Sequence, residues 1–239
     1  KEQFPERFFS FGIAEQNIVA VAAGMALNGL IPVFSTYATF ATMRALDQIR
    51  VSVCYNNLHI VIGGAHAGIS VGPDGATHQA LEDIAVMRVL PFMTVLSPCD
   101  ATQAELAVKA AISQCNGPVY IRFGRESVPD FTEPTQNFVV GKGQLLRDGT
   151  DVTIVSTGHM VYECLEAAKE LENQGISAQV LNIHTINPID RELIVACARK
   201  TNYIVSVEEH QIMGGLGSVV AEELAKNYPC KMEFMGMPD

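Results

Sequence analysis

The side chains best suited to chemistry are two histidines, an aspartate and an arginine that all follow expected strands. His66 and His78 share one glycine-rich loop with Asp74, and imidazole groups can exchange protons near neutral pH. Arg125 ends another strand, and its planar guanidinium suits a phosphate group. The alternative interpretations are a surface turn with chance histidines and an arginine that pairs with a neighbouring carboxylate.

Glu15 is a further candidate because it lies at a junction between two expected elements. The segment Gly12-Ile13-Ala14-Glu15-Gln16-Asn17 separates a strand-like run over residues 7–11 from an apolar helix expected over residues 18–27. Gly12 permits a tight turn, which places Glu15 in the first helical turn. The helix dipole favours an acidic residue there whatever its function, so Glu15 alone indicates little.

The elements that must position these residues alternate between strand and helix, which predicts an α/β fold with two domains. Each domain is expected to be a mostly parallel sheet with helices on both faces. In the first domain we expect strands over residues 30–35, 58–62, 93–97 and 119–123, and helices over residues 18–27, 39–53, 80–88 and 101–114. Ligands bind beyond the carboxyl ends of such strands, so Glu15, the 66–78 loop and Arg125 are expected to converge at one edge.

The domain boundaries are expected at residues 1–126 for the first domain, 127–145 for a linker and 146–239 for the second domain. In the second domain we expect strands over residues 152–156, 178–183, 203–207 and 232–234, and helices over residues 161–173, 190–199 and 216–227. The segment Gly214-Gly215-Leu216-Gly217-Ser218 resembles a phosphate cradle, but tight helix–strand packing is the interpretation we favour. His159, His184 and His210 are expected to be structural.

Composition bounds the class of protein. The 239 residues carry a net charge of -10, which argues against a nucleic-acid partner, and 48% are hydrophobic, which supports a large core. The longest apolar run is too short to span a bilayer, and no two cysteines have C-x-x-C spacing. We therefore expect a cytoplasmic protein with reduced thiols, no membrane partner and no zinc site, and we expect both ends to be trimmed.

Several of these motifs, in this order, resemble transketolase. The resemblance rests on the segments Gly12–Asn17, Ser35–Phe40, His66–Gln79 and Gly124-Arg125, and it extends over essentially the whole chain. Residues 1–126 resemble the pyrimidine-binding domain without its N-terminal portion, and residues 146–239 resemble the C-terminal domain. The implied activity is transfer of a two-carbon ketol unit from a ketose phosphate to an aldose phosphate, as in the pentose phosphate pathway.

The resemblance implies thiamine diphosphate as the coenzyme. Glu15 matches the catalytic glutamate that hydrogen-bonds N1′ of the aminopyrimidine and so favours the imino form of its 4′-amino group. Phe40 matches the aromatic residue that stacks on this ring, and Tyr37 lines the pocket. Met43 departs from the family, in which an aromatic residue often completes the pocket.

The resemblance also implies which residues bind the substrate. His66 and Arg125 match residues that hold the sugar phosphate, and Asp74 matches a carboxylate that contacts a substrate hydroxyl. His78 matches the histidine near the 4′-amino group and the reacting carbon. His66 and His78 are therefore expected to be catalytic as well as substrate-binding, with protons moving between them and the sugar.

A partner subunit is implied by what the chain lacks. The family holds the coenzyme's diphosphate and a divalent metal through a Gly-Asp-Gly segment followed by an asparagine, and the sequence contains no such segment. We therefore expect one subunit of a split transketolase, inactive alone, with magnesium or calcium held by an N-terminal subunit. The pair of subunits is expected to form a homodimer of pairs.

Three rival functions stay open. Deoxyxylulose-phosphate synthase shares the Gly-Ile-Ala-Glu-Gln segment, but a histidine more often stands where this chain has Asn17. The beta subunit of 2-oxo acid dehydrogenases shares the two-domain layout but is not expected to carry the 66–78 loop. A non-catalytic structural partner is the third possibility.

Overall fold

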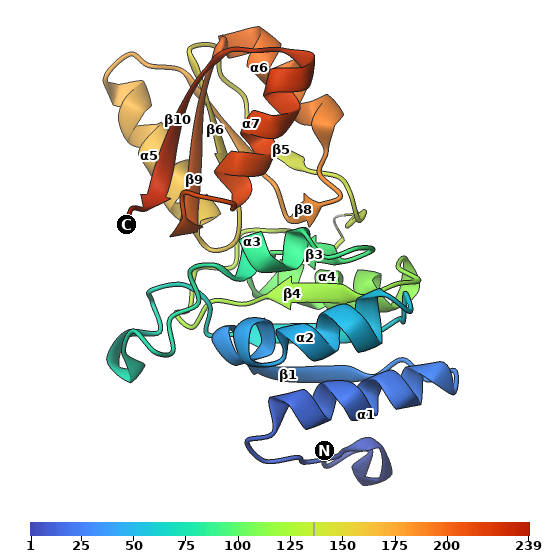
Figure 1. Cartoon of the computed structure of the whole chain (residues 1–239). Coiled ribbons are helices and arrows are strands. Elements are labelled where there is room, and N and C mark those ends of the chain that lie inside the picture. Colours follow the sequence, from blue (N-terminus) through green and yellow to red (C-terminus); the bar gives the residue numbers. More distant parts are fainter. Residues whose placement is uncertain (136) are drawn as a thin grey trace.

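A computed structural model describes residues 1–135 and 137–239, which form two stacked α/β layers (Figure 1). The first sheet has the strand order β1-β2-β4-β3-β8 and the second has the order β10-β9-β6-β7-β5. All strand pairs are parallel except β3 with β8 and β5 with β7. The expected α/β class with two mostly parallel sheets is confirmed.

The first sheet is built mainly from the first half of the chain. Its strands are β1 (Val33–Tyr37), β2 (Val61–Ala65), β3 (Thr94–Leu96), β4 (Val119–Arg122) and β8 (Thr185–Asn187). Its helices are α1 (Glu15–Leu27), α2 (Leu46–Gln48), α3 (Asp83–Arg88) and α4 (Ala101–Ser113), with π-helical turns Phe40–Arg44 and Ile49–Cys54 on either side of α2.

Alternate residues of these strands face two separate cores, which explains why helices cover both faces. Ile62 and Tyr120 belong to a core shared with α1 and α3, whereas Val61 and Ile121 pack against α4. Asp100 caps α4, and its side chain accepts a hydrogen bond from the backbone N–H of Gln103 at 2.8 Å. This N-cap is confirmed.

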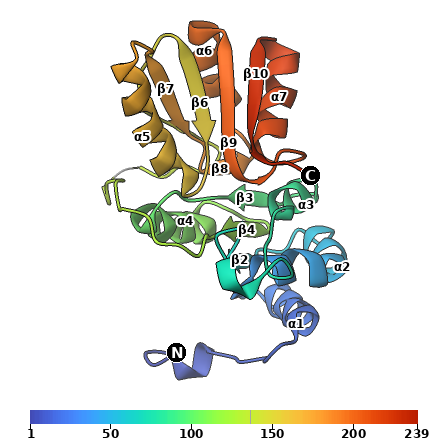
Figure 2. The ribbon, with the colours of Figure 1, turned by 90° about the vertical axis from the view of Figure 1, so that its left-hand side faces the viewer.

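The second sheet belongs to the second half of the chain. Its strands are β5 (Gln144–Arg147), β6 (Val152–Ser156), β7 (Ala178–Asn182), β9 (Tyr203–Gln211) and β10 (Lys231–Met237). Its helices are α5 (Met160–Asn173), α6 (Arg191–Thr201) and α7 (Leu216–Asn227). The helix α5 lies on one face and α6 and α7 lie on the other, as Figure 2 shows.

Two expectations about local structure are wrong. Arg7 ends a 3-10 helix (Pro5–Arg7), and residues 8–11 pair with no strand in the described part of the chain. The N-terminal segment runs away from the first sheet in Figure 2, and Phe8 and Phe9 are exposed. A run of this composition becomes a strand only beside a neighbour that takes up its backbone hydrogen bonds. The single helix expected over residues 39–53 is instead divided into two π-helical turns and the short α2.

The two halves of the chain share a sheet and a core. The strand β8 comes from the second half but pairs antiparallel with β3, with Val95 opposite Asn187. The largest core cluster runs from Val95 and Met93 to Leu181 and Ile186 without interruption. The halves are therefore joined by hydrogen bonds as well as by apolar contact.

His184, just before β8, gives this junction a pH dependence. Its ring stacks on Phe138 with a centroid distance of 4.0 Å, and burial lowers the pKa of the imidazole from 6.5 to about 4. The unfolded chain therefore binds the proton first as the pH falls below 6.5, which removes roughly 3 kcal/mol of stability by about pH 4.

His184→Phe is expected to remove this acid sensitivity, because a phenyl ring keeps the stacking and does not titrate. Urea unfolding at about pH 7 and about pH 4.5 measures the difference between the two proteins, and most of the roughly 3 kcal/mol should be present only with the histidine. An identical loss of stability in both proteins would contradict the assignment.

Candidate active site

Tyr37 lies at the centre of a cluster at the carboxyl ends of β1 and β2. Its ring stacks on His66 with a centroid distance of 4.4 Å and an interplanar angle of 7°, and its hydroxyl donates to Asp74 Oδ2 at 3.2 Å. The parallel register of β1 and β2 places Tyr37 beside Ala65, so His66 emerges next to it. Strand pairing therefore brings together two segments that are distant in sequence.

His78 and Phe40 extend this cluster. The Phe40 ring lies nearly parallel to Tyr37 at 6.0 Å, and the edge of His78 meets both rings, at 5.1 Å from Phe40 and 5.7 Å from Tyr37. The His78 Nδ1 is 2.9 Å from the Thr77 hydroxyl. The loop imidazoles thus both border the aromatic surface of Tyr37 and Phe40.

Glu15 joins the cluster through Arg44. The Glu15 side chain is 5% exposed, and its Oε2 accepts a hydrogen bond from Arg44 Nη1 at 2.8 Å. The Arg44 guanidinium lies 4.1 Å from the centroid of the Phe40 ring. Burial raises the pKa of Glu15, but Arg44, a backbone N–H and the Thr36 hydroxyl outweigh burial and lower it overall, so the carboxyl is ionised.

Arg125 completes the cluster on the other side. Its guanidinium is 3.7 Å from Asp74 Oδ1 and donates a hydrogen bond to the carbonyl of Val71. The Arg125 and Asp74 side chains are each about one-third exposed, so both remain accessible to a ligand. Arg125 thus pairs with a neighbouring carboxylate, and its binding of a phosphate stays a prediction.

The seven residues singled out from the sequence therefore form one continuous set of contacts. The contacts run from Glu15 through Arg44 to Phe40 and His78, and from these to Tyr37. Tyr37 contacts both His66 and Asp74, and Asp74 pairs with Arg125. Met43 is 41% exposed. Convergence at one sheet edge is confirmed, and the role of each residue stays a prediction.

His66 carries two features of a functional position. Its backbone has φ of +58°, a conformation that residues other than glycine rarely adopt. Its Nδ1 is buried and has no hydrogen-bond partner among residues 1–135 and 137–239. A strained histidine with an unsatisfied buried nitrogen fits a ligand-binding role better than a chance surface turn.

Arg44 is a site residue that the sequence reasoning missed. It lies four residues after Phe40, so a helical backbone brings its guanidinium over that ring. That spacing was the available signal. Its partner Glu15 lies 29 residues earlier, and only the packing of α1 against the turn Phe40–Arg44 reveals the pairing.

Two other regions of the chain resemble sites but carry less chemistry. At the start of α7, the backbone N–H groups of Leu216 and Gly217 donate to the Glu208 carboxylate at 2.6 and 2.8 Å. The protein's own carboxylate therefore occupies the place that a phosphate would take. A Cβ on Gly217 would lie 2.6 Å from both Ser206 and Phe234, so the favoured interpretation as tight packing is confirmed.

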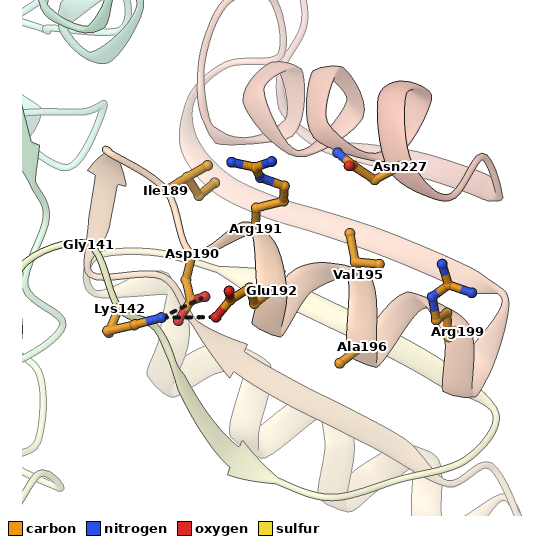
Figure 3. A pocket seen from close by; sticks show the side chains of 10 residues that line it. All are labelled: Gly141, Lys142, Ile189, Asp190, Arg191, Glu192, Val195, Ala196, Arg199 and Asn227. Atoms are coloured by element: carbon orange, nitrogen blue, oxygen red, sulfur yellow. Dashed lines mark hydrogen bonds and ion pairs between the residues drawn. The ribbon is translucent and has the colours of Figure 1, made fainter.

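A cavity of about 620 Å³ lies beside α6 and is shown in Figure 3. Its cations are already engaged. Lys142 pairs with Asp190 and Glu192 at 3.7 and 3.3 Å, and Arg199 lies over the ring of Tyr228. Nothing in its lining suggests catalysis.

Metal and membrane features are also lacking in the described residues. Within residues 1–135 and 137–239, no three histidine, cysteine or acidic side chains are grouped so as to hold a metal ion. No helix in this part of the chain is long and apolar enough to cross a membrane.

The fold and the cluster define a class, the α/β proteins whose site lies beyond the carboxyl ends of a parallel sheet. Comparison with known families narrows this class. Residues 1–130 match the transketolase pyrimidine-binding domain, and residues 141–239 match the transketolase C-terminal domain. The chain belongs to the transketolase family.

Individual relatives agree with this assignment. The chain is 42% identical over 238 residues to the 6-deoxy-6-sulfo-D-fructose transketolase subunit SqwH of Clostridium sp. (strain MSTE9), covering all of this chain and 74% of that one. It superposes with a TM-score of 0.93 and 49% identity on a solved structure described as "Split gene transketolase, inactive beta4 tetramer", covering 100% of this chain and 77% of the other. It therefore corresponds to the C-terminal subunit of split transketolases.

A third relative shows how far the resemblance extends. The 1-deoxy-D-xylulose-5-phosphate synthase of Desulfitobacterium hafniense (strain DSM 10664 / DCB-2) is 41% identical over 225 residues, which cover 93% of this chain but only 35% of that protein. The shared region is thus common to more than one enzyme.

Proposed function

We propose that this chain forms the pyrimidine-facing half of a thiamine-diphosphate site and transfers a two-carbon ketol unit between sugar phosphates, in complex with an N-terminal subunit. The observation that carries the proposal is the continuous set of contacts from Glu15 to Arg125. It places a buried carboxylate, an aromatic surface, two imidazoles and a guanidinium within one site.

The residues of the site fit the coenzyme. The Arg44 guanidinium is planar and donates hydrogen bonds, and it lies over Phe40 while donating to Glu15. An aminopyrimidine ring is also planar, and it would make the same two contacts, stacking on Phe40 and hydrogen-bonding Glu15. Binding therefore requires Arg44 to leave the face of Phe40, and the 44% exposure of its side chain leaves room for this movement.

The residues nearest the coenzyme are assigned the acid–base work. When bound, the coenzyme supplies the nucleophilic carbon that accepts and releases the two-carbon unit. Glu15 holds a proton at the pyrimidine N1′ position, and its burial strengthens that hydrogen bond because water does not compete. His66 and His78 move protons to and from the sugar hydroxyl and carbonyl.

Substrate binding is assigned to the outer part of the cluster. Arg125 and His66 hold the terminal anionic group of the sugar, and Asp74 accepts a hydrogen bond from a sugar hydroxyl. A sulfonate has the same charge-bearing oxygens as a phosphate, and the SqwH relative is named for a sulfosugar. Donors with either group are therefore worth assaying.

The partner is assigned the rest of the site. We propose that an N-terminal subunit holds the diphosphate and a divalent metal ion, magnesium or calcium, and that two such pairs associate. The relative described as an inactive beta4 tetramer is consistent with subunits of this type being inactive without their partner. Copurification followed by coenzyme analysis tests this assembly.

Arg125→Ala is expected to raise KM for xylulose 5-phosphate about 10- to 100-fold, because a charged hydrogen bond is lost. The kcat should change much less, since Arg125 binds the group farthest from the reacting carbon. The assay uses the chain reconstituted with its N-terminal subunit. Lys169→Ala, which removes an exposed ion pair on α5, is the matched control. An equal loss with hydroxypyruvate, which has no phosphate, would contradict the assignment.

A second candidate function is that of a deoxyxylulose-phosphate synthase, favoured by the 41% identity to such an enzyme. The two functions differ in the donor. The reconstituted complex should consume xylulose 5-phosphate with ribose 5-phosphate as acceptor. Consumption of pyruvate instead would identify the synthase.

A further inference from the structure

Glu209, in the second domain, makes contacts that no catalytic assignment explains. It lies near the carboxyl end of β9 and is only 8% exposed. Its Oε1 accepts a hydrogen bond from the backbone N–H of Ser70 at 2.7 Å, and its Oε2 lies 2.5 Å from His159 Nε2. Ser70 belongs to the loop that carries His66, Asp74 and His78.

The loop is shaped to receive this carboxylate. Gly68 has φ of +85°, and a Cβ there would overlap the Glu209 carboxyl group. The backbone N–H of Gly68 donates to the Ala80 carbonyl at 2.9 Å and closes the base of the loop. The carboxylate therefore rests directly against the backbone, two residues after His66.

His159 packs against Gly124, in the segment that also contains Arg125. It lies after β6, and a Cβ on Gly124 would be 2.7 Å from its Nδ1. Gly124 precedes Arg125. The Glu209–His159 pair thus touches both the loop of the imidazoles and the segment of the guanidinium.

The charge and the fixed backbone of Glu209 suit a rigid anchor. Burial raises the pKa of Glu209, but His159, the Ser70 N–H and Arg122 outweigh burial and lower it overall, so the carboxyl is ionised. Its backbone carbonyl accepts a hydrogen bond from Arg122 Nη2 at 2.8 Å. Two residues further along β9, the backbone N–H of Gln211 donates to the carbonyl of Leu81 at 2.8 Å, just beyond the C-terminal end of the 66–78 loop.

We propose that the Glu209–His159 pair of the second domain is a positioning device that sets the 66–78 loop and Arg125 for substrate binding. The expected effect on kinetics rests on the proposed function, whereas the expected effect on the loop's structure rests on geometry alone. A displacement of about 1 Å at such groups can cost about a hundredfold in rate. The second domain is thereby assigned a part in substrate binding.

Glu209→Ala tests the proposal by hydrogen exchange of the purified chain and by kinetics of the reconstituted complex. Amide exchange of peptides covering residues 66–81 and 122–128 is expected to accelerate about 10- to 100-fold, because Ser70 and the loop lose their anchor. The kcat/KM for xylulose 5-phosphate is expected to fall at least about tenfold, because the loop carries both His66 and His78. Glu209→Gln should restore most of both, since its oxygen still accepts from Ser70.

Glu208→Ala is the matched control, because the Glu208 carboxylate accepts hydrogen bonds from the backbone N–H groups of Leu216 and Gly217 at the start of α7 rather than from the 66–78 loop. It should lower the unfolding midpoint while leaving loop exchange and kcat/KM as in the wild type. The proposal is overturned if Glu209→Ala leaves both readouts at wild-type values, or if Glu208→Ala moves them equally.

His159→Ala provides an independent route should Glu209→Ala fail to fold, since the His159 side chain is 17% exposed and lies outside the core. Unchanged exchange over residues 122–128 in that variant would also overturn the proposal. A wild-type complex without two-carbon transfer would refute the proposed function. The exchange measurement would still decide whether Glu209 positions the loop.

Discussion

Glu15→Gln is expected to lower kcat for two-carbon transfer by about 10²- to 10⁴-fold, the range that loss of a positioned acid–base group produces. Glutamine keeps the shape of the side chain but cannot hold a proton at N1′ as a carboxylate can. The buried position, 5% exposed, allows no water to substitute for it. The measurement is steady-state transfer from xylulose 5-phosphate to ribose 5-phosphate in the reconstituted complex.

The control is Glu105→Gln, which removes an exposed carboxylate paired with Lys109 on α4 and should leave kcat unchanged. The rate at which the proton on the coenzyme's reactive carbon exchanges with solvent, measured in both complexes, separates coenzyme activation from later steps. A Glu15→Gln complex with kcat within about twofold of the wild type would exclude acid–base work at this position. It would favour a structural role for the chain.

Asp83→Asn is expected to lower the free energy of unfolding by about 3–5 kcal/mol, the usual cost of leaving a buried charge without its partner. Asp83 is fully buried, and its Oδ2 accepts from Arg122 Nε at 2.8 Å and from the Tyr120 hydroxyl at 2.7 Å. Arg122 also holds the carbonyls of Ala80 and Glu209. The substitution therefore weakens α3, β4 and the contact between domains together.

Urea unfolding followed by circular dichroism measures this loss. Glu222→Gln is the control, because its pair with Arg88 is half-exposed on the Glu222 side and should contribute less than about 1 kcal/mol. Tyr120→Phe, which removes one hydrogen bond and leaves the charges paired, should cost about 1 kcal/mol. A loss of under about 1 kcal/mol for Asp83→Asn would show that the pair contributes little.

Local patterns were enough to predict the elements that depend on local sequence. The helix over residues 216–227 was predicted with the bounds that the structure shows, and Asp100 caps α4 as expected. Repeated strand–helix alternation also predicted that residues after different strands would meet. His66 and Arg125 lie near each other because parallel strands end at one edge, a rule that needs no tertiary detail. Glu15 follows no strand and joins them at the start of α1 through Arg44.

What was missed depends on contacts between distant residues. The strands β5 and β8 are short and pair antiparallel with β7 and β3, so their partners rather than their own sequences define them. Arg44 acquires its role from Glu15, and Glu209 from Ser70 and His159. The sequence alone does not distinguish a charged residue that faces solvent from one that pairs with a buried partner.

The strand β8 has a consequence for how the chain is made. Translation delivers β3 and β4 long before residues 185–187, so the β3 edge of the first sheet stays bare while the ribosome adds the second half. An uncovered edge invites pairing with other nascent chains. The first sheet is therefore completed only when the last third of the polypeptide has been synthesised. A chain whose synthesis stops before residue 185 is expected to aggregate.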